Sequence, residues 1–257
     1  MTRRILLASA LLSVGLTGCA TLGLEHPPVA VPPEPTVQPS TGRPPAPTAS
    51  PVLTQAQAQA ALVTDTDLGA PWTPTRGAAT WRDGLLKART SVAGCQKLLD
   101  ALYTDELFGA PARAVTALDD PDTSAQLRYQ LTDRRPAHVD RTLAWLKSLP
   151  RSCARFTATA GEDTVEDVQV SELPLPEVGD ARQGLRVTLT LWATAEKNPG
   201  GDPTVLALDV AAVRAGQDAF ALTNGAVGDV PNEATQAAVQ LGVRRLADVR
   251  RQGRVQV

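Results

Sequence analysis

The sequence has few of the side chains on which most enzyme sites depend. Its 257 residues include two histidines and three cysteines, and aromatic residues make up only 4 %. No G-x-S-x-G motif occurs, so a Ser-His-Asp hydrolase site would depend on His138, the one histidine in a helical segment. A zinc site needs more Cys and His ligands than the chain has free. We therefore predict a protein that is not an enzyme and has no metal and no cofactor.

Two acidic clusters, at residues 119–122 and 162–167, contain carboxylate oxygens that Ca²⁺ could use. Neither has the spacing of an EF-hand, and we interpret both as solvated turns. Hydrolysis of a glycoside needs two close carboxylates, and only the fold sets that distance. A hydrolase of cell-envelope material therefore remains an alternative.

The chain also lacks an excess of positive charge. It has 25 basic and 27 acidic residues, a formal net charge of −2. Removal of residues 1–18 would take away Arg3 and Arg4 and leave a net charge of −4. Proteins that bind nucleic acids need a concentrated basic surface. We therefore predict no nucleic-acid partner.

The first apolar run is too short to span a bilayer, which needs about 20 residues. Arg3 and Arg4 precede the run at 5–16, which is the layout of a secretory signal. The next residues, Leu16-Thr17-Gly18-Cys19, resemble the bacterial lipobox, in which the cysteine receives a diacylglycerol and becomes the N-terminus after cleavage. We predict a lipoprotein signal peptide at residues 1–18. Cys19 would carry the lipid anchor, including palmitate, on the extracytoplasmic face of the cell membrane.

Alternatives to this interpretation are an ordinary signal peptide that happens to contain a cysteine, and an uncleaved anchor. Arg3-Arg4 also partly resembles a twin-arginine signal, but we favour the general secretory route. Residues 19–52 follow as the lipidated cysteine and a proline-rich linker, with ten prolines between Pro27 and Pro51. Such a segment samples polyproline II, and at about 3.1 Å per residue it could extend on the order of 100 Å. Residues 53–257 are long enough for a single domain with a sizeable core.

The patterning of residues 53–257 predicts an α+β domain. Thr54-Gln55-Ala56-Gln57 matches a capping box. Helical periodicity predicts helices over 54–62, 91–103, 136–150 and 232–250. Alternating or β-rich segments predict strands over 113–118, 125–131, 165–172, 185–193, 205–214 and 218–223, with another beginning near Cys153. Short turns between strands indicate a mostly antiparallel sheet, and we expect helices packed on one face.

If Cys19 carries lipid, Cys95 and Cys153 are the remaining cysteines, in an oxidising compartment. We predict one disulfide between them. It would close a loop of 58 residues and, in the chain-entropy model, contribute about 4 kcal/mol. The alternative is two buried free thiols.

One strand has an unusual outer face. Leu185, Val187, Leu189 and Leu191 alternate with Arg186, Thr188, Thr190 and Trp192. A large aromatic residue beside Arg and Thr on an uncovered sheet face is typical of a shallow binding surface. We predict that Trp192, Arg186, Thr188 and Arg128 bind a ligand, and we expect Arg128 and Gln130 to share this face. The alternative is a solvated sheet face.

Several of these features together resemble the PknH-like extracellular sensor domain, which occurs outside bacterial Ser/Thr kinases and in free-standing actinobacterial lipoproteins. They are the cysteine-bearing helix Ala93-Gly94-Cys95-Gln96-Lys97-Leu98-Leu99, then Trp145 and Cys153, the strands, and the Ala/Val/Leu/Arg-rich last helix. The resemblance implies an antiparallel sheet with flanking helices, a cleft, and ligand sensing without catalysis. This chain differs in having one cysteine pair where the kinase domain has two disulfides, and in having neither a kinase domain nor a transmembrane helix.

These observations favour a membrane-anchored, non-enzymatic lipoprotein with a ligand-binding, sensor-like domain. Its partners would be the membrane, through Cys19, and a small ligand or an envelope protein. The alternative is a structural or assembly lipoprotein that binds envelope proteins.

Overall fold

The computed structural model describes residues 52–77, 81–161, 164–192 and 202–255. The predicted signal peptide, Cys19 and all of the predicted linker except Val52 lie outside the described residues. The described chain forms a nine-stranded sheet in which every pairing is antiparallel, in the order β1-β3-β4-β9-β8-β7-β6-β5-β2. The strands are β1 (Thr73–Pro74), β2 (Ala88–Arg89), β3 (Ala114–Asp120), β4 (Ala125–Thr132), β5 (Arg155–Ala160), β6 (Thr164–Glu172), β7 (Ala181–Leu191), β8 (Thr204–Ala215) and β9 (Asp218–Val227).

The four predicted helices are present, with two short helical segments that the periodicity did not predict. The helices are α1 (Gln55–Ala60), α2 (Asp65–Leu68), α3 (Ala93–Tyr103), α4 (Pro136–Ser152) and α5 (Asn232–Val255), with a π-helical turn, η1, at Arg82–Leu86. The capping box of α1 is confirmed: the backbone N–H of Gln57 donates to the Thr54 hydroxyl at 3.2 Å, and the Thr54 N–H donates to Gln57 Oε1 at 2.8 Å. Helix α4 continues past Pro150, which lies in its last turn.

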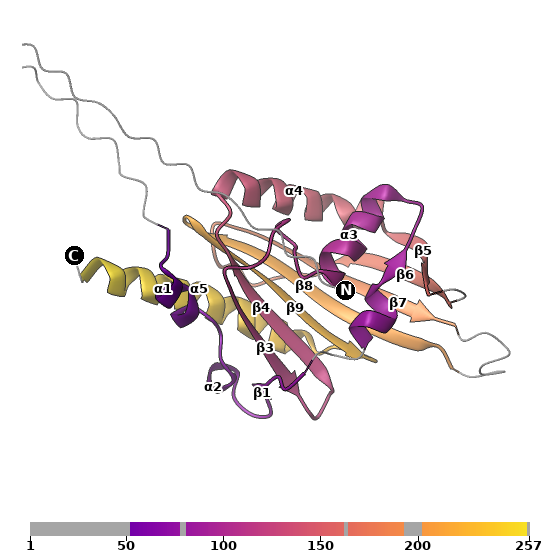
Figure 1. The fold of residues 1–257 in the computed structure, drawn as a ribbon, viewed down its shortest axis with the longest axis horizontal. Coiled ribbons are helices and arrows are strands. Elements are labelled where there is room, and N and C mark those ends of the chain that lie inside the picture. The colour runs from indigo at the N-terminus through magenta and orange to yellow at the C-terminus, as the bar shows by residue number, and fades with distance from the viewer. Residues whose placement is uncertain (1–51, 78–80, 162–163, 193–201, 256–257) are drawn as a thin grey trace, which may run out of the picture. The chain divides into compact units, whose positions relative to one another are not determined.

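Helices cover both faces of the sheet, whereas the sequence predicted them on one. In β8, Leu208 and Val210 pack in a core with α3 and α4, and Ala211 and Val213 pack in a second core with α1 and α5. The physical reason is that β8 is apolar on both faces, so each face has to be covered. Figure 1 shows α3 and α4 near each other beside the sheet, with α5 running along the strands.

The predicted disulfide joins the two helices on the first of these faces. Cys95 lies in the first turn of α3 and Cys153 directly follows α4, with 5.7 Å between their Cα atoms. Both cysteines are buried, at 0 % and 2 % exposure. The α+β class, the antiparallel sheet and the single disulfide are therefore confirmed.

Candidate ligand-binding site

Trp192 directly follows the last residue of β7 and is 58 % exposed, unusually high for a large apolar side chain here. Arg186 and Thr188 lie on one side of β7, because Leu185, Val187 and Leu189 fill the opposite side, in the core with α3 and α4. Thr188 is half-buried. The alternation predicted from the sequence is therefore present in this strand.

The guanidinium of Arg186 is held by other residues of the domain. Its Nε donates to Asp209 Oδ1 at 2.8 Å, and one Nη donates to the carbonyl of Val230 at 2.8 Å. Asp209 is fully buried, and its other oxygen accepts from the Thr235 hydroxyl at 3.0 Å. The hydrogen bond to Asp209 raises the pKa of Arg186. Arg186 thus holds the buried carboxylate of Asp209 and the chain before α5 in place. Its Nε and one Nη already donate to these groups and are not free to bind a ligand.

Arg128 does not share a face with Arg186. In the register, Arg186 pairs with Asp209, Asp209 pairs with Asn224, and Asn224 pairs with Leu127. Residues paired directly across strands point to the same side, so Leu127 is on the side of Arg186. Its neighbour Arg128, and Gln130 with it, therefore point to the other side, toward α3. The expectation of a shared face is wrong because the sequence does not show which strands lie between β4 and β7.

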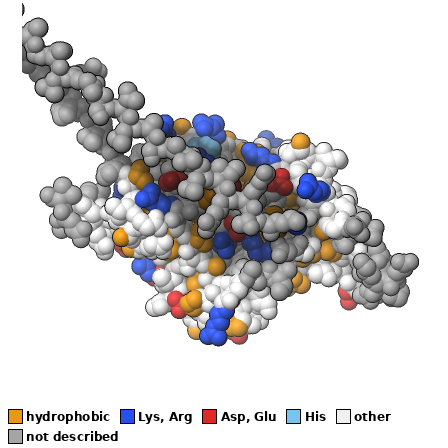
Figure 2. Space-filling view, in the orientation of Figure 1, with side chains coloured by type: hydrophobic (Ala, Val, Ile, Leu, Met, Phe, Trp, Pro, Cys, Tyr) orange, Lys and Arg blue, Asp and Glu red, His pale blue; other side chains and the backbone are white. Residues whose placement is uncertain are grey.

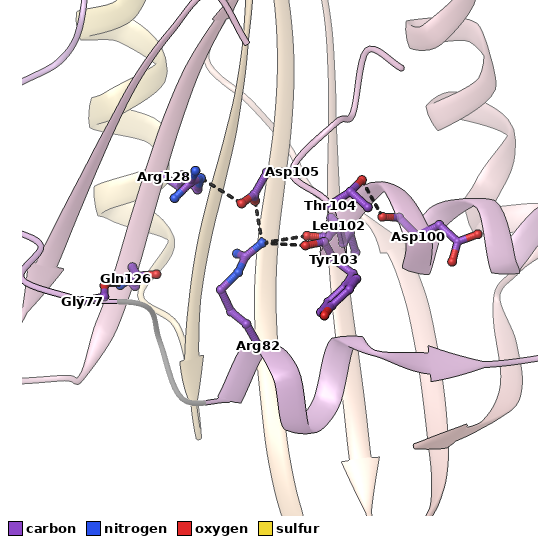
Figure 3. Close-up of polar contacts among 9 residues, drawn as sticks. All are labelled: Gly77, Arg82, Asp100, Leu102, Tyr103, Thr104, Asp105, Gln126 and Arg128. Atoms are coloured by element: carbon purple, nitrogen blue, oxygen red, sulfur yellow. Dashed lines mark hydrogen bonds and ion pairs between the residues drawn. The ribbon is translucent and has the colours of Figure 1, made fainter. Parts of the chain in front are cut away.

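On that other side, Arg128 belongs to a three-residue ionic group (Figure 3). Asp105 accepts from Arg82 at 2.6 Å and from Arg128 at 2.9 Å. Arg82 also donates to the carbonyl of Leu102, at the C-terminal end of α3, at 2.9 Å. Cations at a helix C-terminus are favourable because the helix dipole is negative there. This group links η1, the end of α3 and β4.

A cavity of about 320 Å³ opens where α4 begins, and we call it the α4 pocket. Apolar side chains from α1, β4 and the neighbouring loops form part of its wall: Val52, Leu53, Ala58, Leu131 and Pro136. The charged residues that line it are Arg113, Asp133, Arg134, Arg135, Asp218 and Arg250. Pockets of this size and mixed character are typical of sites for small ligands.

The charge of the α4 pocket is positive. Arg250 forms a two-point ion pair with Asp218, with N–O distances of 2.5 and 2.7 Å. The other lining charges are Arg113, Arg134 and Arg135 against Asp133 alone, which leaves an excess of two positive charges. On the face shown in Figure 2, basic and acidic side chains are otherwise interspersed.

Two donors in this pocket have no acceptor. One Nη of Arg134 donates to the carbonyl of Gly109 at 2.8 Å. The Nε atoms of Arg113 and Arg134 are buried, and within the described residues they have no hydrogen-bond partner. A buried polar group without a partner costs about 1–3 kcal/mol. A ligand with an acceptor oxygen would remove that cost once the side chains around these atoms shift to admit it.

The N-terminus of α4 adds to the positive electrostatic potential of the α4 pocket. Arg135 is the N-cap residue and makes no side-chain capping bond, and the first turn contains no acidic residue. Pro136 is the first helical residue, which fits the sequence prediction for the start of this helix. The positive end of a 17-residue helix therefore borders the pocket, where an anion would be favoured.

The sequence analysis did not identify this pocket. Its four arginines come from three places, before β3, before α4 and near the end of α5, and each looks like an ordinary surface charge in the sequence. The available signal was Arg134-Arg135-Pro136, two cations before a helix start where acidic residues would be usual.

The remaining residues that could have supported chemistry have structural partners. His138 Nε2 lies 2.9 Å from the carbonyl of Phe108, an arrangement in which the ring N–H donates. Asp120, the last residue of β3, accepts from the N–H groups of Asp122 and Thr123 in the following turn, but it is only 8 % exposed and so is not solvated as predicted. Glu166 and Asp167 of the second acidic cluster lie in β6 and not in a turn. Within the described residues, no group of three or more His, Cys, Asp or Glu side chains could hold a metal ion. None of the helices in this part of the chain is both long and apolar enough to cross a bilayer.

No protein-family model matches the chain, and a search of curated proteins finds no significant match. Among solved structures, the chain is similar to the extracellular domain of PknH from Mycobacterium tuberculosis, with 14 % sequence identity and a TM-score of 0.45. That alignment covers 77 % of this chain and 98 % of the other. A likeness at this level leaves the function to be argued from the residues of this chain.

Proposed function

We propose that this chain is a lipid-anchored, extracytoplasmic protein whose domain binds a ligand without catalysis. The lipobox-like Leu16-Thr17-Gly18-Cys19 and the proline-rich linker support the anchor. The Cys95–Cys153 disulfide supports an oxidising compartment, because such bonds persist outside the cytoplasm.

The ligand is a small anionic amphiphile, with a carboxylate or phosphate head and a short apolar tail, and it binds in the α4 pocket. One observation carries this proposal: buried guanidinium N–H groups of Arg113 and Arg134 have no described partner, beside an apolar wall. The head would accept from these donors, in charge-assisted hydrogen bonds that are stronger than neutral ones. The tail would cover Leu53 and Leu131.

Titration with laurate below its micellar concentration, followed by calorimetry, tests this proposal. We expect saturable binding at one site. Arg113→Gln and Arg134→Gln should each weaken it about tenfold or more, because a lost charge-assisted bond is worth about 1.5–3 kcal/mol. Arg141→Gln is the matched control, since Arg141 is exposed on α4, close to Arg134 in the sequence, and does not line the pocket.

Dodecanol provides the chemical control, because it has the same tail without the negative charge. Equal affinity for dodecanol and laurate, or laurate binding that survives both arginine substitutions, would show that the pocket does not select an anion. Absence of any saturable laurate binding would also contradict the proposal.

The anchor is tested separately in cells fed an alkyne-labelled palmitate. The wild-type chain should take up the label and fractionate with membranes, and Cys19→Ala should lose both properties. Label retained by Cys19→Ala would contradict anchoring at this residue. Ligand binding by the domain does not depend on this result.

A second candidate function is docking to an envelope protein through Trp192 and Thr188. The 58 % exposure of Trp192 favours it, since exposed aromatic residues are enriched at interfaces. Crosslinking in cells should show one dominant partner that Trp192→Ala loses while laurate binding stays unchanged. A partner pattern that Trp192→Ala leaves intact would exclude this surface.

A further inference from the structure

A second cavity, of about 300 Å³, lies at the opposite end of α5, and we call it the α5 pocket. Its wall combines the first turns of α5 with the chain around α2, the β3–β4 hairpin and β9. The lining residues are Leu68, Trp72, Asp120, Thr123, Asn224, Pro231, Glu233, Ala234 and Ala237. Arg250, near the C-terminal end of α5, lines the α4 pocket, so the two cavities are separate.

The α5 pocket contains a fully buried acceptor that has no described donor. Asn224 is 0 % exposed and lines the pocket. Its Nδ2 donates to the Thr235 hydroxyl at 3.2 Å, and that hydroxyl donates to Asp209 Oδ2 at 3.0 Å. Since the Thr235 proton is directed to Asp209, the amide of Asn224 must present its nitrogen to Thr235. Its Oδ1 is buried and has no partner among the described residues.

The side chains around this acceptor are negative, and their two charges outweigh the positive N-terminal end of α5, which carries about half an elementary charge. Asp120 and Glu233 line the pocket, and no Lys, Arg or His side chain does. The buried Asp209 lies behind Asn224 and is already neutralised by Arg186 at 2.8 Å. Leu68 and Trp72 add apolar surface to the wall. The cavity therefore offers the amide oxygen of Asn224, the carboxylate of Glu233 and an apolar side, and Asp120, whose oxygens accept from the turn, adds its negative charge.

We propose that the α5 pocket binds a small primary amine in its ammonium form. An ammonium N–H would donate to Asn224 Oδ1 after a shift of the surrounding side chains opens this buried oxygen to the cavity, and its charge would be balanced by Glu233 and Asp120. The carbon chain of the amine would lie against Leu68 and Trp72. This site is independent of the α4 pocket, which has the opposite charge.

The test uses n-butylammonium as the probe, with NMR detection on the full chain. We expect saturable shifts of the Asn224 side-chain amide and the Trp72 indole N–H. n-Butanol, which lacks the charge, and tetramethylammonium, which lacks an N–H, should each bind about tenfold more weakly or worse. Binding of tetramethylammonium as tight as that of butylammonium would overturn the proposed bond to Asn224.

Two variants complete the test without touching the buried network. Ala237→Phe fills the pocket from an exposed helix position and should abolish butylammonium binding. Glu233→Gln should weaken it severalfold, whereas Glu177→Gln, at a 94 % exposed side chain outside the pocket, should not. Both pocket variants should still bind laurate. Shifts that do not saturate, or that persist in Ala237→Phe, would overturn the proposal.

Discussion

Arg186 and Asp209 form an ion pair whose two members differ in exposure. The Arg186 side chain is 30 % exposed, whereas that of Asp209 is completely buried. Water can hydrate the arginine if its partner is lost, but it cannot reach the carboxylate. Removal of the arginine should therefore cost more than neutralisation of the acid.

This asymmetry gives a prediction for urea unfolding. Arg186→Met leaves a buried charge with only the Thr235 hydroxyl as a described donor, and should lower the free energy of unfolding by about 3–5 kcal/mol. Asp209→Asn keeps the shape and should cost only about 1–2 kcal/mol. Equal losses, or a larger loss for Asp209→Asn, would contradict the assigned roles.

At the scale of residues, the sequence predicted side-chain direction better than side-chain partners. The alternation in 185–192 placed Arg186 and Thr188 on one side of their strand correctly. It could not show that Arg186 pairs with Asp209, because that contact depends on the register between β7 and β8. Arg128 was assigned to the wrong face for the same reason.

Helix α5 approaches the sheet closely at a glycine, Gly242. A Cβ atom at Gly242 would lie 2.7 Å from the Tyr129 hydroxyl oxygen and 2.9 Å from Phe220 Cζ. Both rings are fully buried, and they contact each other with their centroids 4.8 Å apart. Neither ring can move without displacing the core beneath α5.

Gly242→Ala should therefore destabilise the protein, although the same change in an open helix stabilises by about 1 kcal/mol. Overpacking of this kind costs about 1–3 kcal/mol. Tyr129→Phe should partly restore stability, because it removes the oxygen nearest to the new methyl group. Thermal unfolding of the two single variants and the double variant measures this, and a higher midpoint for Gly242→Ala would refute the close approach.

Periodicity predicted the strands and helices of ordinary length. It did not predict that helices cover both faces of the sheet, although one strand carried a signal for this. The run Val205–Arg214 is apolar at nearly every position, which indicates burial on both faces of β8. Helices on a single face could not have provided that burial. The short elements α2, β1 and β2 span only two to four residues, too few for any periodicity to register.

For the whole molecule, the disulfide constrains the unfolded chain over 58 residues. Replacing both Cys95 and Cys153 by alanine should lower the free energy of unfolding by about 4 kcal/mol in the chain-entropy model. Reduction of the wild-type protein should produce a similar loss, and the double variant should not respond to a reductant. A loss below about 1 kcal/mol would show that the loop is already ordered in the unfolded state.

The candidate sites were harder to predict from the sequence than the secondary structure or the layering of the fold. Each pocket collects residues from segments more than 100 positions apart, such as Arg113 with Arg250, or Trp72 with Asn224. The composition indicates only a nearly neutral chain and does not show that the two cavities carry opposite charges. Charge separation of this kind emerges only when the fold brings distant segments together.

The two outermost strands of the sheet have a consequence for how neighbouring copies behave. β1 and β2 contain two residues each, and Pro74 in β1 has no N–H to donate. A long exposed edge strand can pair with the edge strand of another molecule and start a polymer. Strands of two residues offer too few unpaired backbone groups for a second molecule to extend the sheet. If the proposed lipid anchor holds the chain at a membrane, neighbouring copies would meet often within one plane. The short edge strands β1 and β2 would then keep many neighbouring copies from assembling into fibres.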